Sequence, residues 1–243
     1  MIEAKPSRWA LFTFDIYIKR LLKRHFFRLN MLGEIPDVDP ALPLILTPNH
    51  STWWDGFFVY ILNQKYYNRP FYLMMLERQL AKYSFFSRLG AYSIDQKRPK
   101  KVIESLSYTV ELLNRQTENP PVVCIFPQGI LLPWSTRPIV FQKGLDWIIR
   151  KYEKTINVLP LAMRAEYTGE QNAEVFFLFG KNQIIETGNF WGTKQLAKIE
   201  EDLLDELQDR MLRQEDSVDL LKGKSSINTK WDHVRHGSRK DDS

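Results

Sequence analysis

Short apolar runs alternate with amphipathic stretches through the middle of the chain. Runs typical of buried strands occur at residues 44–47, 71–75, 91–94, 122–126, 157–162 and 175–179. Helical patterns lie between them, at residues 57–62, 78–87, 101–115 and 143–152. Strands that alternate with helices predict an α/β fold, with a mixed, largely parallel sheet flanked by helices. In such sheets ligands bind beyond the carboxyl ends of the strands.

The amino-terminal segment predicts a separate amphipathic helix over residues 1–32. Its apolar positions recur at helical spacing and would form one stripe: Leu11, Phe14, Ile18, Leu21, Leu22, Phe26 and Leu29. Arg20, Arg24 and Arg28 would form a basic row beside it. Aromatic side chains next to such a row are typical of a helix that lies in the membrane interface and faces anionic head groups. The alternative is a helix that packs on its own domain, with its basic face in water.

The rest of the chain divides into a core domain and two carboxyl-terminal segments. We assign residues 33–192 to the core domain. Residues 193–221 predict a long charged helix that packs on this domain. Its apolar face would consist of Leu196, Ile199, Leu203, Leu207 and Met211. Residues 222–243 are polar and rich in charge, which predicts a disordered tail.

Composition narrows the class of protein. Hydrophobic residues make up 44% of the 243 residues and charged residues 26%, which is ordinary for a globular domain. No apolar run reaches the roughly 18–20 residues that a membrane-spanning helix needs. The single cysteine, Cys124, predicts neither disulfides nor a cysteine-based metal site, and indicates a reducing, cytoplasmic setting. The net charge of +5 accompanies no recognised nucleic-acid motif, so nucleic acid is not an expected partner.

The first candidate chemistry lies where the strand at residues 44–47 ends. His50 follows that strand, and Asp55 stands at the start of the next helix. The ordinary pKa of histidine is about 6.5, which suits a base near neutral pH. A neighbouring carboxylate can hold the imidazole in one tautomer and stabilise the imidazolium that forms. The alternative is local structure alone, with Asp55 as the N-cap of the helix and His50 beside it.

Three further segments fall at the ends of expected strands. Residues 126–129 read FPQG and end one strand abruptly. Residues 90–95 form a short strand that leads into Gln96, Lys97 and Arg98. Residues 158–162 form a late strand that contains a proline. Each segment alone fits ordinary turn and strand chemistry, but their common position at strand ends predicts one shared site.

Together, the order and spacing of these blocks resemble the glycerolipid acyltransferase family, whose best-known members acylate lysophosphatidic acid or glycerol 3-phosphate. Asn49, His50 and Asp55 resemble its NHxxxxD block, and residues 126–129 resemble its FPEG block. Residues 90–95 and 158–162 resemble its second and last blocks. The resemblance covers roughly residues 44 to 180. It implies that His50 is the general base, that Asp55 orients it, and that the reaction needs no metal or resident cofactor.

The chain departs from the family pattern where the phosphate of the acceptor would bind. Gln128 stands in place of the family's glutamate, and Gln96 in place of an arginine. The arginine that usually follows the third block is also missing, because residues 130–133 read ILLP. The backbone near Gly129 is the candidate donor to the oxyanion. The expected substrate-binding residues are Asn49, Gln96, Arg98, Gln128, Gly129, Arg137 and Lys143.

The sequence thus predicts a peripheral enzyme on the cytoplasmic side of a membrane, with residues 33–192 as its acyltransferase domain. The expected reaction moves a fatty acyl group from acyl-CoA or acyl-carrier protein to the hydroxyl of a lysophospholipid or another lipid or glycolipid alcohol. Two alternatives stay open: a relative that binds lipid or acyl-CoA without turnover, and an acyl-thioesterase that uses water as the acceptor. Product analysis separates the three, because they yield an ester, nothing and a free acid, respectively.

Overall fold

The structure, a computed structural model, describes residues 1–224, and within them the strands form one nine-stranded sheet. The strand order is β4-β3-β5-β2-β6-β7-β1-β9, with β8 paired to β6. The strands are β1 Phe26–Leu32, β2 Leu44–Pro48, β3 Phe71–Leu76, β4 Ala91–Ile94, β5 Val122–Cys124, β6 Ile156–Glu166, β7 Ala173–Phe179, β8 Gln183–Ile185 and β9 Ser217–Lys222. Strands β2, β3, β4, β5 and β6 pair in parallel, whereas β6 with β7 and β1 with β9 are antiparallel. The predicted mixed, largely parallel α/β sheet is confirmed.

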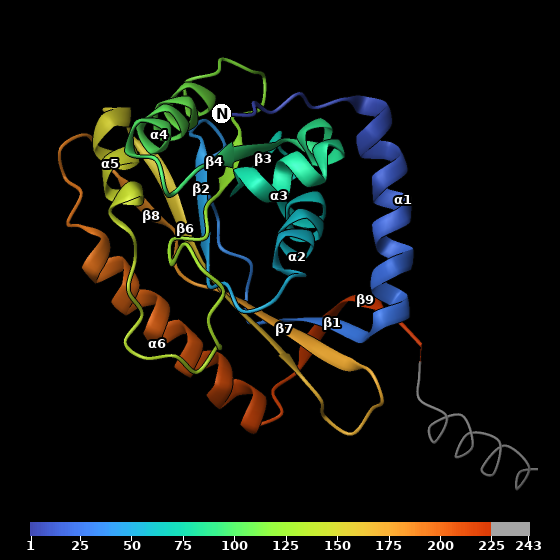
Figure 1. Ribbon diagram of the computed structural model, residues 1–243. Coiled ribbons are helices and arrows are strands. Elements are labelled where there is room, and N and C mark those ends of the chain that lie inside the picture. The colour runs from blue at the N-terminus through green and yellow to red at the C-terminus, as the bar shows by residue number, and fades with distance from the viewer. Residues whose placement is uncertain (225–243) are drawn as a thin grey trace, which may run out of the picture.

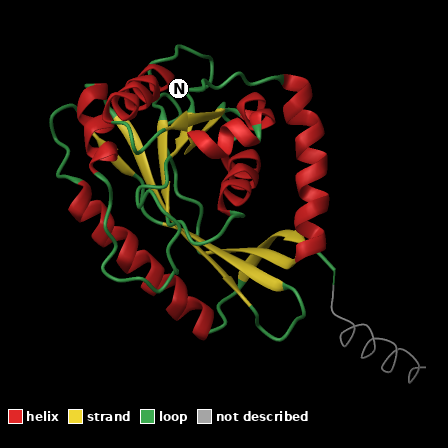
Figure 2. Cartoon of the chain, viewed as in Figure 1, coloured by secondary structure: helices red, strands yellow, loops and turns green. Residues whose placement is uncertain are grey.

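Helices cover both faces of this sheet (Figures 1 and 2). They are α1 Arg8–His25, α2 Asp55–Leu62, α3 Glu77–Lys82, α4 Pro99–Leu113, α5 Lys143–Tyr152 and α6 Thr193–Leu212, with a π-helix at Asn63–Tyr67 and a 3-10 helix at Ser84–Leu89. Helices α4, α5 and α6 lie against one face and share one apolar core with it. Helices α1 and α2 lie against the other face over a second core. The sheet therefore separates two cores.

The amino-terminal segment is not one helix through residue 32, as predicted. Helix α1 ends at His25, and the next residues form β1, which lies between β7 and β9 in the sheet. Phe26 and Leu29 fit the helical spacing of the stripe, but both are buried in this strand. The pairing partners lie about 150 and 190 residues further along the chain, and this long-range pairing overrides the local helical pattern.

The predicted apolar stripe of α1 packs on the domain itself. Phe14, Ile18 and Leu22 are buried in the core beneath α1 and α2. A different set of apolar side chains on this helix faces outward: Trp9, Phe12, Ile16 and Tyr17. The stripe therefore packs on its own domain, as in the alternative given above, and the outward set is the apolar surface of α1 that remains available for another contact.

The carboxyl-terminal helix is also shorter than the predicted range 193–221. Helix α6 ends at Leu212, and Gln214 adopts a positive φ of 52° that ends the helical path. The chain then forms β9, which pairs antiparallel with β1 and includes Lys222, the first residue of the predicted tail. Residues 225–243 of that predicted tail lie outside the described residues.

Gly90 allows the chain that enters β4 to lie very close to the backbone of β3. Its φ is +99°, and a Cβ at this position would lie 2.1 Å from the carbonyl oxygen of Phe71. We expect Gly90→Ala to lower the free energy of unfolding by at least about 1–3 kcal/mol, the cost of the backbone conformation alone. Urea unfolding measures this change. Gly169→Ala is the matched control, because Gly169 has a φ of +105° and open space around it; equal losses in the two variants would contradict the steric argument.

Candidate active site

His50 and Asp55 form a hydrogen-bonded pair beyond the carboxyl end of β2. His50 Nδ1 lies 2.8 Å from Asp55 Oδ2. The same carboxylate oxygen accepts hydrogen bonds from the backbone N–H groups of Ser51 and Thr52, at 2.7 and 2.9 Å. Asp55 Oδ2 is the acceptor in all three hydrogen bonds, so Nδ1 carries the proton of the neutral imidazole. Nε2 is then the ring nitrogen that can accept a proton.

Asp55 is held rigidly by the turn that precedes α2. The hydroxyl of Thr52 donates to Asp55 Oδ1 at 2.5 Å and accepts the backbone N–H of Trp54 at 3.2 Å. The Asp55 side chain is 3% exposed, whereas that of His50 is 24% exposed. Asp55 is the first residue of α2 rather than its N-cap. This geometry suits an orienting carboxylate with a partly accessible base in front of it.

The loop that follows β5 makes three contacts with His50, one to its ring and two to its backbone. The ring of Phe126 stacks on the imidazole, with centroids 4.0 Å apart. The side-chain carbonyl of Gln128 accepts the backbone N–H of His50 at 2.9 Å, and the backbone N–H of Leu132 donates to the His50 carbonyl at 2.9 Å. The loop therefore fixes both the backbone and the ring plane of His50.

Two of the predicted substrate-binding residues instead tie the protein together. The Asn49 side chain is buried and bonds both the N–H and the carbonyl of Met163 in β6, at 2.7 and 3.0 Å. Gln128 is 4% exposed and is engaged with His50, as described above. Both residues set the position of His50, and neither lines the cavity beside it.

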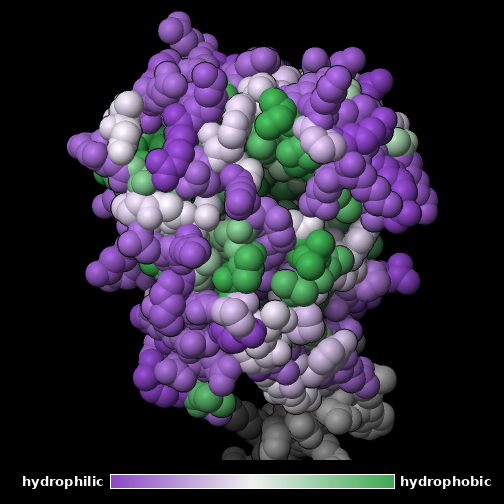
Figure 3. All heavy atoms as spheres, turned by 60° about the vertical axis from the view of Figure 1, so that its left-hand side comes forward, coloured by the Kyte–Doolittle hydropathy of each residue, from purple (hydrophilic) through white to green (hydrophobic). Residues whose placement is uncertain are grey.

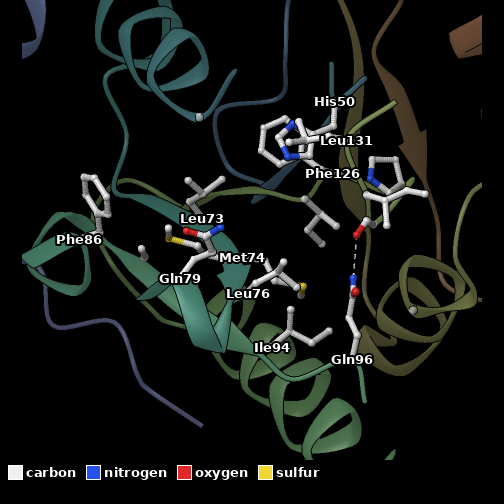
Figure 4. Close-up of a pocket in the computed structure, with 18 of the residues that line it drawn as sticks. His50, Leu73, Met74, Leu76, Gln79, Phe86, Ile94, Gln96, Phe126 and Leu131 are labelled. Carbon is white, nitrogen blue, oxygen red and sulfur yellow. Dashed lines mark hydrogen bonds between the residues drawn. The ribbon is translucent and has the colours of Figure 1, made fainter. Parts of the chain in front are cut away.

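Gln96 and Gly129 meet across the site. The Gln96 side-chain amide donates to the Gly129 carbonyl at 2.9 Å (Figure 4). Gly129 adopts a φ of +74°, and its own N–H donates to the Phe126 carbonyl at 3.0 Å. The predicted oxyanion donor near Gly129 is therefore not the N–H of Gly129 itself. The next N–H along the chain, that of Ile130, has no acceptor among the described residues.

A cavity of about 400 Å³ opens beside His50, within the range of about 300–1,000 Å³ typical of small-molecule sites. Phe126, Gln96 and Gly129 are among the residues that line it, and within the described part of the chain none of its lining residues is Lys, Arg, Asp or Glu. The exposed apolar side chains at its rim are Trp53, Leu76, Tyr83, Ile130 and Leu131, and the exposed polar residues Gln96 and Gln142 also line it. Figure 3 shows hydrophobic side chains gathered around a hollow in one otherwise largely hydrophilic face. The cavity suits hydrocarbon chains.

Comparison with known proteins identifies the family. The sequence model of a family described as acyltransferase matches residues 31–164, more than half of the chain. The chain belongs to this acyltransferase family. Among solved structures, the 1-acyl-sn-glycerophosphate (LPA) acyltransferase PlsC from Thermotoga maritima has a similar fold, with a TM-score of 0.55 and 16% sequence identity over 82% of this chain and 78% of that one. A search of curated proteins found no match.

The cations predicted to bind substrate lie outside the cavity of this acyltransferase. Arg98 forms ion pairs with Asp95 and Glu77. Arg137 pairs with Asp205 on α6 at 2.6 Å and bonds two carbonyl groups of its own loop. Lys143 begins α5 and is exposed, although its neighbours Gln142 and Gly144 line the cavity. The structure thus brings Gln96 and Gly129 to the cavity, but not these three cations.

Several residues that shape the acyltransferase site were not found from the sequence. Thr52 has the spacing to bond a carboxylate three residues on, which is a local signal that the sequence offers. Phe14, the residue of α1 that lines the cavity, gave no such signal, because its place there depends on the packing of distant elements. Phe126 belongs to the predicted block at residues 126–129, but its stacking on the His50 ring was not predicted. Among residues 1–224, no three His, Cys, Asp or Glu side chains converge as a metal site would require.

A buried acid lies behind the site. Glu200 on α6 is fully buried, and neither of its carboxyl oxygens makes a hydrogen bond of normal geometry. Burial raises the pKa of Glu200 well above its ordinary value, while the nearby backbone N–H groups of Asn49 and Leu161 and the charge of Arg137 oppose that rise. The pKa of Glu200 is therefore held well above that of an exposed glutamate, and this side chain lies close to the strand end that bears His50.

Proposed function

We propose that this acyltransferase moves a fatty acyl group from a thioester, acyl-CoA or acyl-carrier protein, to a lipid hydroxyl at the membrane surface. The observation that carries the proposal is the His50–Asp55 pair at the edge of an apolar cavity whose lining, within the described residues, includes no Lys, Arg, Asp or Glu. Among residues 1–224, His50 is the histidine that lines this cavity, and the apolar remainder of the lining suits a hydrocarbon chain.

The proposed mechanism has no acyl-enzyme. His50 Nε2 takes the proton of the acceptor hydroxyl as its oxygen attacks the thioester carbonyl, and Asp55 stabilises the imidazolium that results. The backbone N–H of Ile130 and the amide of Gln96 are the candidate donors to the oxyanion. When the tetrahedral intermediate collapses, the C–S bond breaks and the leaving thiolate takes the proton from His50. The proposal gives Ser51 no role as a nucleophile, because among the described residues its hydroxyl bonds the Asn49 amide and makes no hydrogen bond to His50.

The charge of the residues that line the cavity limits which acceptors can bind there. A lysophospholipid and another lipid or glycolipid alcohol are both acceptors that this chemistry accommodates. Burying a phosphate costs free energy unless a cation pairs with it. Since no Lys or Arg in residues 1–224 lines the cavity, an acceptor whose hydroxyl has no adjacent phosphate fits better.

The test of this function is product analysis with a long-chain acyl-CoA donor and an extract of membrane lipids. Thiol release together with a new ester, both lost in His50→Ala, is the expected result, and mass spectrometry of the ester identifies the acceptor. A free acid in place of the ester would support the thioesterase alternative. Absence of both products, with acyl-CoA and with acyl-carrier protein, would support a lipid-binding relative without turnover.

The proposed membrane contact is the outward face of α1. Trp9, Phe12 and Tyr17 are 55%, 69% and 57% exposed, and the ring of Phe85 lies 6.2 Å from that of Trp9. Exposed cations follow on the same helix, at Arg20, Lys23 and Arg24. Aromatic side chains beside cations suit an anionic lipid surface. Among residues 1–224, no helix is long and apolar enough to cross a bilayer.

Replacement of two of these aromatic residues tests the contact. We expect Trp9→Ser with Phe12→Ser to weaken binding to anionic liposomes by about tenfold or more, because each buried aromatic side chain contributes about 1.5–3 kcal/mol. Sedimentation with liposomes measures the binding. Trp191→Ser is the matched control, since Trp191 is an exposed tryptophan that precedes α6. Removing residues 1–30 would be a poorer test, because it deletes most of β1. Unchanged binding in the double variant would place the contact elsewhere.

A further inference from the structure

The cavity beside His50 extends over both faces of the sheet. One part, which we name the α1 chamber, lies within the core beneath α1 and α2 and is lined by Phe14, Phe57, Phe71, Leu73, Phe86 and Leu89. The other part, the α4–α5 chamber, lies within the opposite core and is lined by Met74, Ile94, Leu106, Ile125, Leu145 and Ile148. Figure 4 shows Phe86 at one end of the lining and Ile94 well away from it, with Leu73 and Met74 between them.

The two chambers meet where β5 ends. Strand β3 pairs with β5 only from Phe71 to Leu73, because β5 stops at Cys124, whereas β3 continues to Leu76. Beyond that point the chain turns away through Phe126, and the cavity passes from one face of the sheet to the other. His50 and Phe126 stand at this junction and line the cavity there.

We propose that the two chambers hold two different hydrocarbon chains: the α4–α5 chamber takes the acyl chain of the donor, and the α1 chamber takes an apolar chain of the acceptor. This inference rests on the proposed function, since transfer between a fatty thioester and a lipid brings two chains to one reacting centre. It defines the acceptor as a long-chain alcohol that is uncharged next to its hydroxyl. Both chains would point away from His50, on opposite faces of the sheet.

The assignment of donor to the α4–α5 chamber follows from the groups at its entrance. Gln96 and Gly129, with the free N–H of Ile130 next to them, stand on this side and suit the thioester carbonyl. Three exposed lysines also lie at or just before the amino-terminal ends of α4 and α5: Lys97, Lys100 and Lys143. None of these three has a carboxylate partner in the described residues. Unpaired cations at helix amino termini complement the phosphates of coenzyme A or of phosphopantetheine.

The assignment of acceptor to the α1 chamber follows from its surroundings. Phe14 lines this chamber from the buried face of α1, while Trp9 and Phe12 expose the outward face of the same helix. Trp53 and Tyr83 give the rim on this side an aromatic character and are 56% and 41% exposed. A lipid alcohol that leaves a membrane in contact with α1 would therefore meet an apolar entrance directly.

A matched pair of substitutions tests the assignment. Leu73 and Leu106 line different chambers, and each is replaced by phenylalanine to shorten its own chamber. Leu106→Phe should reduce kcat/KM for the longest acyl donors by about tenfold or more relative to short ones, and Leu73→Phe should do the same for the longest alcohol acceptors. Each variant should leave the order of preference among the other substrates unchanged. A shift in donor preference from both variants would show that one acyl chain occupies both chambers and would overturn the proposal.

Equilibrium binding to the wild-type protein gives a second test that needs no turnover. S-hexadecyl coenzyme A, a thioether that cannot transfer its chain, and 1-dodecanol are titrated separately and together by calorimetry. Two separate chambers predict that each ligand still binds when the other is saturating. Mutual exclusion would overturn the proposal. Simultaneous binding without any ester product from true substrates would instead contradict the proposed function and leave the two chambers in place.

Discussion

Replacing His50 by alanine should lower kcat for acyl transfer by about 10²–10⁴-fold, the usual contribution of a well-placed general base. In the wild-type protein Asp55 is bonded to Nδ1, so Nε2 is the nitrogen that is available to take the hydroxyl proton in the proposed mechanism. Alanine removes this base at the cavity junction but leaves the apolar walls in place. KM for both substrates should therefore change little. Steady-state thiol release, with the ester quantified by mass spectrometry, gives both constants.

Two further variants separate the base from its surroundings. Asp55→Asn keeps an oxygen that can accept the N–H groups of Ser51 and Thr52, but it removes the charge that stabilises the imidazolium, so we expect a loss of kcat of similar order. His25→Ala is the matched control, because His25 is exposed at the end of α1 and lies outside the cavity. Full activity of a folded His50→Ala protein, with folding checked by thermal unfolding, would reject His50 as the base.

The alternation of strands and helices could be predicted because it depends on local periodicity. The strands at residues 44–47 and 91–94 lie where the apolar runs place them, and α5 has the predicted bounds. Strand β1 could not be found in this way. Phe26 and Leu29 are three residues apart, which fits a helical face as well as it fits a buried strand. Only the partners β7 and β9, which come much later in the chain, decide between the two.

Prediction of the site from the sequence was limited in the same way, to contacts between residues that are close in the chain. His50 and Asp55 are five residues apart, so one turn could be predicted to bring them together. The roles of Asn49 and Gln128 depend on partners 114 and 78 residues away. Gln128 was expected to alter the binding of an acceptor phosphate. Instead its carbonyl accepts the backbone N–H of His50, a bond that a glutamate could also make. The change at this position therefore keeps the support of His50. The stronger argument about the acceptor is that no Lys or Arg of residues 1–224 lines the cavity.

Glu200→Gln should make the protein progressively more stable than the wild type as the pH rises above about 5. Burial raises the pKa of Glu200 in the folded protein, whereas an unfolded glutamate titrates near 4.3. Above that pH, unfolding releases the proton of Glu200, so wild-type stability falls with pH until the folded carboxyl itself ionises. A glutamine binds no proton in either state. The difference in free energy of unfolding should grow by about 1.4 kcal/mol per pH unit, the slope that one proton gives.

Urea unfolding at pH 5, 6, 7 and 8 measures this difference, with Glu206→Gln as the matched control. Glu206 lies on the exposed side of α6 and pairs with Arg210. Glu206 is exposed, so the argument from burial does not apply to it, and the control should not reproduce the slope with pH. A pH-independent difference for Glu200→Gln would mean that the carboxyl is already ionised in the folded protein. Its charge would then stand behind Asn49 and His50, where burial without a partner is most costly.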